Sequence, residues 1–585
     1  MIPRSTTGGS PAGTADSLVA RIDAAGRDEV WIDRVSASDL AIAVAAVESR
    51  LAAGEDLPLA GTTFAVKDNI DVAGVATTAA CPAYATVADA TAPAVDALLD
   101  AGAVYVGKTN LDQFATGLVG TRSPYGAVRN AVDPQRISGG SSSGSAVAVA
   151  LGLVDFSLGT DTAGSGRVPA ALNGIVGIKP TRGLVPTTGV VPACRSFDCV
   201  SVFARTVQLA ERVLAVLAST GPTGRAPDTA DRRPVPATAP LGPPTAPVVG
   251  RASPEALGAL DPGRLWSYQA AVDRLERSGC TTVVIDLEPF LAAGRLLYQG
   301  AFLAERYDAV GTWVDAHLGE VDPVVGSIIS SASELTAAEL ARDVDRLARL
   351  AATASDLLAS AGACSLLLPT VTLHPTLAEV AADPMGVNAQ LGVFTQFVNL
   401  LDMCAVAVPS EPVDGLPFGV SLIGPAWSDR VQADLARRVE GGDASPTDDD
   451  RWSRPAFPSV RLAVAGAHLS GQPLNHQLTD RGARLVTTTT TAPHYRLFAL
   501  DTEPPKPGLV READGTGAAI EIEVWELPPV GFAAFVATLP HPMAIGPVTL
   551  ADGTEVSGFG CEPMALDGAL DITASGGWRA HLSGD

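Results

Sequence analysis

The feature that most constrains the fold is the segment from Ser138 to Arg167, in which two turns rich in glycine and serine flank one apolar run. The apolar run, 146–154, predicts a buried helix, and Phe156–Leu158 predicts a short strand before the second turn. A flexible linker has a similar composition to the first turn. An apolar helix between two such turns favours instead a folded site in which two serines share one place, because glycine lets the backbone approach a ligand.

One reading of this segment is a nucleophile elbow, since Gly140–Gly144 fits the spacing G-x-S-x-G. That motif follows an apolar strand, whereas Asn130–Ile137 reads as a polar turn broken by proline. A Ser-His-Asp triad also needs a histidine, and only His317 and His374 precede the C-terminal region. A late histidine is permitted in that fold, so this alternative stays open, but a lysine is the obvious other base.

Three blocks of sequence resemble the amidase signature family. They are G-G-S-S at Gly139–Ser142, G-T-D-x-x-G-S-x-R at Gly159–Arg167, and K-D-N at Lys67–Asn69. The resemblance covers roughly the first three quarters of the chain. It implies an α/β fold, the amidase signature fold, with a mixed central sheet layered by helices.

By the same resemblance, Ser165 is the nucleophile, Ser141 the bridging serine and Lys67 the base. A lysine can take a proton near neutral pH only if its pKa falls from about 10.4, and burial has that effect. The apolar residues Phe64–Val66 before Lys67 predict a buried strand end. Taken alone, Lys67 is better read as a solvated residue, and it is the two serine blocks that reverse this interpretation.

The turn before the nucleophile supplies backbone N–H groups. Thr162, Ala163 and Gly164 are therefore candidates for an oxyanion hole, in which each donor typically contributes about 2.7–4 kcal/mol to the transition state. Asp161 and Arg167 are interpreted as an ion pair that ties the turn together.

Several segments narrow the resemblance to the allophanate hydrolases within this family. They are Asp112–Gly126, Val191–Arg195, the pair Ala163–Gly164 where most members carry two glycines, and Gly466–Asn475. The resemblance implies an amidohydrolase that cleaves allophanate, which is urea-1-carboxylate, to ammonia and N-carboxycarbamate. No cofactor and no metal are expected, and either urea degradation or s-triazine breakdown would supply the substrate.

A tyrosine and an arginine eight residues apart hold the substrate carboxylate in this subgroup, and Tyr298 and Arg306 occupy that pattern. Eight residues are just over two helical turns, so we expect both side chains on one face of one helix. Without the resemblance, the pair reads as a half-buried tyrosine and a solvated arginine on an ordinary amphipathic helix.

The C-terminal part, 459–585, has a character of its own, with strands predicted at 461–466, 484–491, 520–525 and 548–559 and short helices at 474–482 and 531–539. The resemblance implies an α+β fold similar to γ-glutamylcyclotransferases and a part in breaking N-carboxycarbamate down to carbon dioxide and ammonia. His468 is the candidate catalytic histidine and His476 the runner-up. The alternative is a purely structural or oligomerisation module, whose strand edges suit a homodimer.

The 585 residues divide by composition into an amidase region, 1–440, a Pro/Gly-rich acidic linker, 441–458, and the C-terminal domain. A Pro-rich loop is predicted at 221–249. The net charge of −24 argues against nucleic acid or an anionic membrane as partner, and the apolar runs are too short to span a bilayer. Seven scattered cysteines without a C-x-x-C pair predict reduced thiols in a cytoplasmic protein.

Other functions share the same signature. A glutaminase-type subunit of a transamidation complex is one, and it would have no use for the C-terminal domain. A general amidase is another. A degenerate amidase kept as a scaffold is a non-enzymatic reading, against which the intact Lys67, Ser141 and Ser165 speak.

Overall fold

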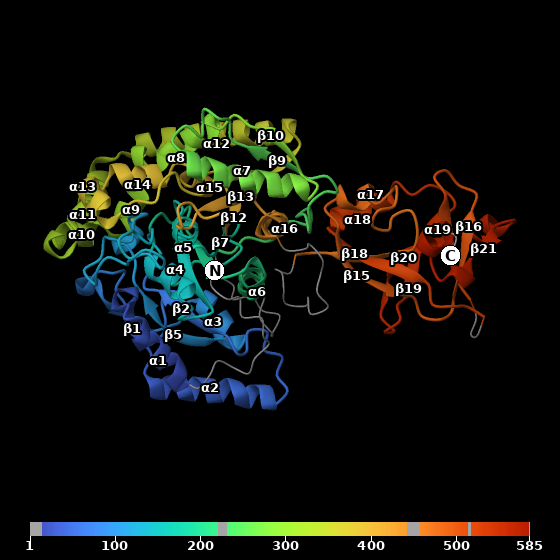
Figure 1. Cartoon of the computed structure of the whole chain (residues 1–585), viewed down its shortest axis with the longest axis horizontal. Helices are drawn as coiled ribbons and strands as arrows, with labels where there is room; N and C mark the ends of the chain where they lie inside the picture. The colour runs from blue at the N-terminus through green and yellow to red at the C-terminus, as the bar shows by residue number, and fades with distance from the viewer. Residues whose placement is uncertain (1–14, 220–230, 442–456, 513–515, 584–585) are drawn as a thin grey trace. The chain divides into compact units, whose positions relative to one another are not determined.

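The computed structural model describes residues 15–219, 231–441, 457–512 and 516–583 (Figure 1). It divides into two compact units. The first contains the described residues up to Pro234 and from Val248 to 441, and the second contains Val235–Pro247 and the described residues from Phe457 onward.

The first unit is built on one mixed sheet of eleven strands. Pairing is parallel along β5–β2–β6 and along β11–β9–β10, and antiparallel between the other neighbours. In sheet order the strands are β1 (Trp31–Arg34), β5 (Val104–Thr109), β2 (Thr63–Lys67), β6 (Phe156–Asp161), β8 (Cys199–Ala204), β7 (Val176–Lys179), β12 (Met403–Pro409), β13 (Gly419–Pro425), β11 (Ala363–Pro369), β9 (Val248–Arg251) and β10 (Thr281–Val284). The predicted mixed sheet of an α/β fold is thereby confirmed.

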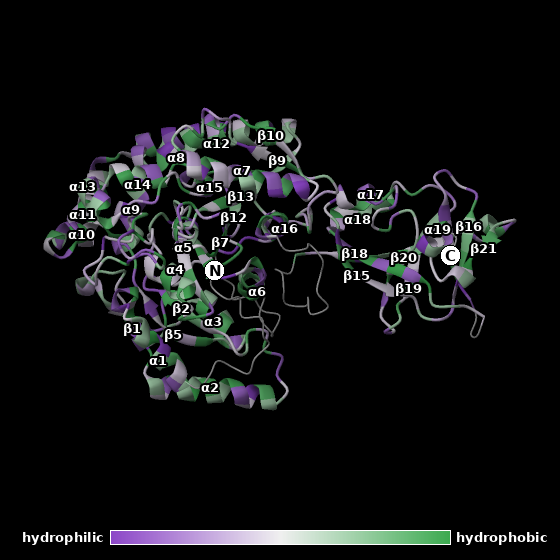
Figure 2. Cartoon of the chain, in the orientation of Figure 1, coloured by the Kyte–Doolittle hydropathy of each residue, from purple (hydrophilic) through white to green (hydrophobic). Residues whose placement is uncertain are grey.

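Helices layer this sheet (Figure 1). The helix α2 begins after Ser36, whose hydroxyl accepts a hydrogen bond from the Asp39 N–H at 3.2 Å, as expected for a capping serine. Hydrophilic and hydrophobic residues alternate along α2 in Figure 2, and Leu40 lies on its buried side. The helices are α1 (Ala15–Ala25), α2 (Ala37–Ala52), α3 (Pro93–Asp100), α4 (Ser143–Ala150), α5 (Val168–Asn173), α6 (Val207–Ala218), α7 (Pro262–Arg277), α8 (Glu288–Gln299), α9 (Leu303–Arg306), α10 (Thr312–Ala316), α11 (Pro323–Ser330), α12 (Ala337–Ser360), α13 (Leu377–Ala382), α14 (Gly386–Leu391), α15 (Gln396–Leu400) and α16 (Asp429–Glu440).

The helix α4 is the apolar run predicted from the sequence, and it is buried on all sides. Ala146, Val147, Ala148 and Val149 have no exposed surface. A helix without a polar face must be covered by other elements, and α4 contacts β6 and α5. The two Gly/Ser turns at its flanks are therefore held by a rigid core.

The second unit has a five-stranded sheet in the order β15–β18–β14–β20–β19 and a three-stranded sheet in the order β17–β16–β21. The single strand predicted at 548–559 is instead the hairpin of β19 and β20, because the chain reverses at Gly553, whose φ is +85°. The strands are β14 (Val460–Val464), β15 (Arg484–Thr490), β16 (Tyr495–Leu500), β17 (Lys506–Arg511), β18 (Glu521–Leu527), β19 (Met543–Thr549), β20 (Glu555–Cys561) and β21 (Leu570–Asp571), and the helices are α17 (His476–Thr479), α18 (Pro529–Val536) and α19 (Trp578–Ser583).

The segments predicted as loop and linker are only partly described. Residues 221–230 of the Pro-rich loop and 442–456 of the linker lie outside the described residues. Residues 232–247 form neither helix nor strand, and Val248 already belongs to β9. Part of this loop packs within the second unit, where the Leu241 N–H donates to the Gly482 carbonyl at 2.8 Å.

Candidate active site

The site forms where β2 and β6 end beside the turn that opens α4. Lys67 is the last residue of β2 and is fully buried. Its Nζ donates to Ser141 Oγ at 2.8 Å and to Thr160 Oγ1 at 2.7 Å, and Ser141 Oγ donates to Ser165 Oγ at 3.0 Å. The structure thus brings the three residues named from the sequence into one unbroken chain of hydrogen bonds.

Burial lowers the pKa of Lys67 to about 7. The carboxylates of Asp112, Asp161 and Asp198 oppose this shift, and the positive charge of Arg306 adds to it. A substantial fraction of the lysine is therefore neutral near pH 7, which an exposed lysine would not be. A neutral amine that touches a serine can accept its proton.

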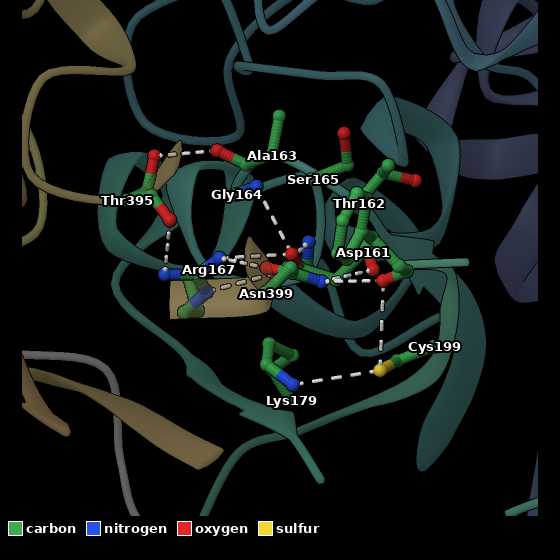
Figure 3. A network of polar contacts seen from close by, with 12 residues as sticks. Asp161, Thr162, Ala163, Gly164, Ser165, Arg167, Lys179, Cys199, Thr395 and Asn399 are labelled. Carbon is green, nitrogen blue, oxygen red and sulfur yellow. Dashed lines mark hydrogen bonds and ion pairs between the residues drawn. The ribbon is translucent and has the colours of Figure 1, made fainter. Parts of the chain in front are cut away.

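An ion pair supports the turn that carries Ser165. The Arg167 guanidinium donates to both oxygens of Asp161, at 2.9 and 2.8 Å, as Figure 3 shows. It also donates to the Thr395 carbonyl at 3.0 Å and to Asn399 Oδ1 at 3.1 Å. Burial alone would raise the pKa of Asp161, but the Arg167 charge and its hydrogen bonds outweigh burial and hold that pKa below its usual value.

The turn is also held from the other side. The hydroxyl of Thr395 donates to the Ala163 carbonyl at 2.7 Å, and a Cβ added at Gly164 would lie only 2.3 Å from that hydroxyl oxygen. With its φ of +131°, position 164 accepts glycine alone without strain. The turn therefore needs glycine at this position for two independent reasons.

The three predicted oxyanion donors differ in whether their backbone N–H groups are already hydrogen-bonded. The Gly164 N–H donates to Asp161 Oδ1 at 3.0 Å, so it serves the turn, and the expectation is corrected for that residue. The backbone N–H groups of Thr162 and Ala163 donate to no other residue that the structure describes. Of the three predicted donors, these two are left to meet a ligand. The Thr162 hydroxyl is fixed separately by a short hydrogen bond to Asp198.

Asp112 organises the loop around Ser141, a role that was not predicted from the sequence. Its backbone N–H donates to the Ser141 carbonyl at 3.1 Å, and its carboxylate accepts from the N–H groups of Gly120 and Arg122, each at 3.0 Å. A Cβ at Gly140 would lie 2.1 Å from Asp112 Oδ2. The peptide bond between Gly140 and Ser141 is cis.

Tyr298 and Arg306 do not share a helix, so that prediction is wrong. Tyr298 lies in the last turn of α8, and Arg306 ends α9. The helix stops because Gly300 adopts an extended conformation and Asp343 accepts the next N–H, that of Ala301, at 2.7 Å.

The two residues also differ in surroundings. Tyr298 is half-buried and lines a cavity of about 600 Å³ together with Arg122. Arg306 is 2% exposed and donates to Thr116 Oγ1 at 2.6 Å and to the Phe114 carbonyl at 3.1 Å. Within the described residues, neither Arg122 nor Arg306 forms an ion pair with a carboxylate. Two buried positive charges thus lie near each other, since Arg122 donates to the carbonyl of the same Thr116 at 3.0 Å.

His374 does not complete a serine–histidine pair. Its Nε2 lies 3.2 Å from the Ile137 carbonyl and 3.3 Å from Asn130 Nδ2. Ser142, the central serine of that motif, immediately precedes the helix α4, and no strand leads directly into the motif. Both observations disfavour the nucleophile elbow.

The candidate histidine of the second unit lies in another environment. His468 is 7% exposed, stacks on Phe559 with ring centroids 5.0 Å apart, and meets Phe535 edge-on. Its Nε2 lies 3.1 Å from Gln477 Oε1, and burial lowers its pKa to about 4. The runner-up His476 is exposed, with Nδ1 3.0 Å from the Pro473 carbonyl.

Two known family profiles match this chain, one in each of its two parts. The profile of the family Amidase matches residues 15–431, and that of the allophanate hydrolase C-terminal domain matches residues 460–583. The chain therefore belongs to the amidase family. In the described residues, no helix is both long and apolar enough to cross a membrane.

Within that family the similarity extends along the whole chain to allophanate hydrolase. The solved Kluyveromyces lactis allophanate hydrolase is 39% identical, with a TM-score of 0.85, covering 99% of this chain and 97% of that one. Urea amidolyase of Lachancea kluyveri is 41% identical over 97% of this chain, which spans about a third (32%) of that longer protein. One subunit of the glutamyl-tRNA(Gln) amidotransferase from Deinococcus deserti is 34% identical over 75% of this chain and 95% of its own length.

Proposed function

We propose that this chain hydrolyses allophanate to ammonia and N-carboxycarbamate. The observation that carries the proposal is the buried hydrogen-bond chain Lys67–Ser141–Ser165. Its support from the comparisons is the similarity to an allophanate hydrolase over 99% of the chain. The relatives called urea amidolyases support urea degradation as the setting.

In the proposed mechanism Ser165 Oγ attacks the carbonyl carbon of the substrate. Its proton passes to Ser141, whose own proton passes to neutral Lys67, because serine hydroxyls can rotate to reverse the direction of their hydrogen bonds. The free N–H groups of Thr162 and Ala163 stabilise the negative oxygen that forms.

The relay then runs backwards. Lys67 returns its proton through Ser141 to the terminal nitrogen, the C–N bond breaks, and ammonia leaves an acyl ester on Ser165. Water loses a proton to the same relay as it attacks the ester, and N-carboxycarbamate leaves as Ser165 regains its proton. One water molecule is consumed for each allophanate.

We propose that Arg306, together with Tyr298, binds the substrate carboxylate. A buried guanidinium without a carboxylate partner is costly, and an anionic substrate would supply the missing partner. The hydrogen bonds of Arg306 to Phe114 and Thr116 leave further N–H groups of the guanidinium for that contact.

The test is ammonia release from the purified protein offered allophanate, glutamine or malonamide. We expect kcat/KM for allophanate to exceed that for either of the others by at least about 100-fold, since malonamide has no carboxylate and the carboxylate of glutamine is farther along the chain from its amide. A preference for glutamine would favour the transamidation reading, and equal use of all three would favour a general amidase.

For the second unit we propose that His468 takes part in breaking down N-carboxycarbamate. Protonation of the N-carboxycarbamate nitrogen releases one carbon dioxide and leaves carbamate. The carbamate takes up another proton and gives a second carbon dioxide and ammonia. Neutral imidazole carries one N–H and one free ring nitrogen, so His468 can pass a proton from water to the N-carboxycarbamate nitrogen. The test is separate measurement of ammonia and carbon dioxide for the unaltered chain, His468→Ala and His476→Ala; unchanged carbon dioxide release in His468→Ala would leave only a structural role.

We also propose a cytoplasmic homodimer. The support is that all seven cysteines are free and that the five-stranded sheet of the second unit ends in β15 and β19, whose edges suit pairing. Sedimentation of the purified protein under reducing conditions tests the dimer.

A further inference from the structure

A cavity of about 180 Å³ lies beside His468 in the second unit. At about 30 Å³ per water molecule it has room for about six waters, which suits a small organic molecule rather than a peptide. Its walls come from the end of β14 and the loop that follows, from α17, from β17 and the residues before it, from the segment after α18, and from β19 and β20. The polar or titratable side chains among the lining residues are His468, Gln477, Lys506 and Thr538.

The charge of this cavity is positive. Lys506, the first residue of β17, lines it, and no Asp or Glu is among the described lining residues. Nor does the Lys506 ammonium hydrogen-bond or ion-pair with any residue that the structure describes. An uncompensated cation in a recess of a chain with a net charge of −24 attracts an anion.

His468 cannot supply that charge near neutral pH. Burial, together with the nearby positive charge of Lys506, lowers its pKa to about 4, although the hydrogen bond to Gln477 opposes the shift. The imidazole is therefore neutral at pH 7. Lys506 is the single cation that the described lining offers.

The placement of Lys506 follows from a close backbone approach. A Cβ at Gly466 would lie 2.1 Å from Pro507 Cδ, so only glycine lets β17 come this near to the loop that carries His468. Lysine is also rare in this chain: four of its 40 basic residues are lysines. The other three, Lys67, Lys108 and Lys179, are fully buried.

We propose that this cavity binds a small dicarboxylate dianion, that Lys506 pairs with one of its carboxylates, and that His468 faces the bound molecule. The inference rests on the proposed function and deepens it, because N-carboxycarbamate is such a dianion. It assigns Lys506 as a substrate-binding residue of the second unit.

The experiment uses the full chain and malonate, which has a CH₂ group where N-carboxycarbamate has N–H and is stable in solution. Nuclear magnetic resonance of histidine-labelled protein follows the ring signals of His468, identified by their absence in His468→Gln. Malonate is titrated into the unaltered chain, Lys506→Met and Lys506→Arg. Arg511→Met, at the other end of the same strand, is the matched control for the loss of one positive charge.

We expect a saturable shift of the His468 signals in the unaltered chain. The malonate dissociation constant should rise at least about tenfold in Lys506→Met, as for loss of a charge-assisted hydrogen bond, and stay within about threefold in Lys506→Arg and Arg511→Met. A missing shift in the unaltered chain, or equal dissociation constants in Lys506→Met and Arg511→Met, would overturn the proposal.

The proposed hydrolysis of allophanate and the proposed dianion site are tested by separate measurements. Ammonia release from allophanate reports on the first unit, and the His468 signals report on this cavity. A chain that releases ammonia but shows no malonate shift at His468 keeps the amidohydrolase and loses the dianion site. A chain that shows the shift but releases no ammonia keeps the site for a small dicarboxylate and loses allophanate as the source of that molecule.

Discussion

Gly164 and Thr395 approach each other so closely that no side chain fits between them: a Cβ at Gly164 would lie 2.3 Å from Thr395 Oγ1. The same hydroxyl donates to the carbonyl of Ala163 at 2.7 Å. The turn that presents Ser165 is therefore positioned by a residue far away in the sequence, just before α15, as well as by its own ion pair.

Gly164→Ala should consequently reduce kcat by about 100-fold or more, because displacing a reacting group by about 1 Å can cost that much. The measurement is ammonia release at saturating substrate. Gly152→Ala is the matched control: position 152 also has a positive φ, +69°, but the nearest atom to an added Cβ is 3.5 Å away. Equal activity of the two variants would show that the contact with Thr395 does not set the site.

The relay should behave as one unit. Ser165→Ala and Lys67→Ala should each lower kcat by at least about 10³-fold, and the double variant should be little worse than either, since both remove the same proton path. Ser143→Ala, whose hydroxyl donates to the Asn110 carbonyl instead, should keep most activity. If the loss of kcat in the double variant equalled the product of the two single losses, a single relay would be contradicted.

Activity should rise with pH through about 7, where Lys67 loses its proton. Below that pH the lysine is charged and cannot accept a proton, so kcat should fall about tenfold for each further pH unit. Above it the rate should level off. The measurement is kcat between pH 5.5 and about 9; a flat profile across pH 7 would mean that Lys67 is not the group whose protonation limits turnover.

The ion pair beneath the turn should matter for stability. Asp161→Leu leaves the buried Arg167 charge unpaired and should lower the free energy of unfolding by about 3–5 kcal/mol. Adding Arg167→Met should recover much of that loss. Urea unfolding of the two variants measures the difference, and an Asp161→Leu protein as stable as the unaltered chain would show that the pair adds nothing.

The sequence was most informative where function and local structure coincide. The helix α4 and the capping Ser36 follow from short segments whose residues contact each other or their own turn. Lys67 lies 74 positions before Ser141, and the family resemblance, rather than a local pattern, grouped these two residues with Ser165. Thr395 and Asp112 were missed because their roles depend on packing between distant segments.

Helix ends were the other difficulty. The resemblance and the spacing of eight residues suggested that Tyr298 and Arg306 share a helix face, but Gly300 ends the helix with the help of Asp343, a residue 42 positions later than Ala301. The hairpin at Gly553 was similarly read as one strand, since the apolar pattern continues on both sides of the turn.

The final prediction concerns substrate choice. Arg306→Ala should reduce kcat/KM for allophanate at least about 100-fold more than for an uncharged amide such as malonamide, because the lost guanidinium pairs with a carboxylate that only allophanate has. Arg306→Lys keeps the charge but not the planar fork of the guanidinium. Its kcat/KM for allophanate should therefore lie between those of the unaltered chain and Arg306→Ala.

Arg122 supplies the matched comparison for that test. It is also a buried arginine next to Thr116, but it donates to the carbonyls of Thr116 and Pro384 and lines the cavity with Tyr298. If Arg306 binds the carboxylate, Arg122→Ala should lower stability without the same discrimination between charged and neutral substrates. Equal losses on both substrates in Arg306→Ala would instead assign Arg306 to the support of the loop at Phe114 and Thr116.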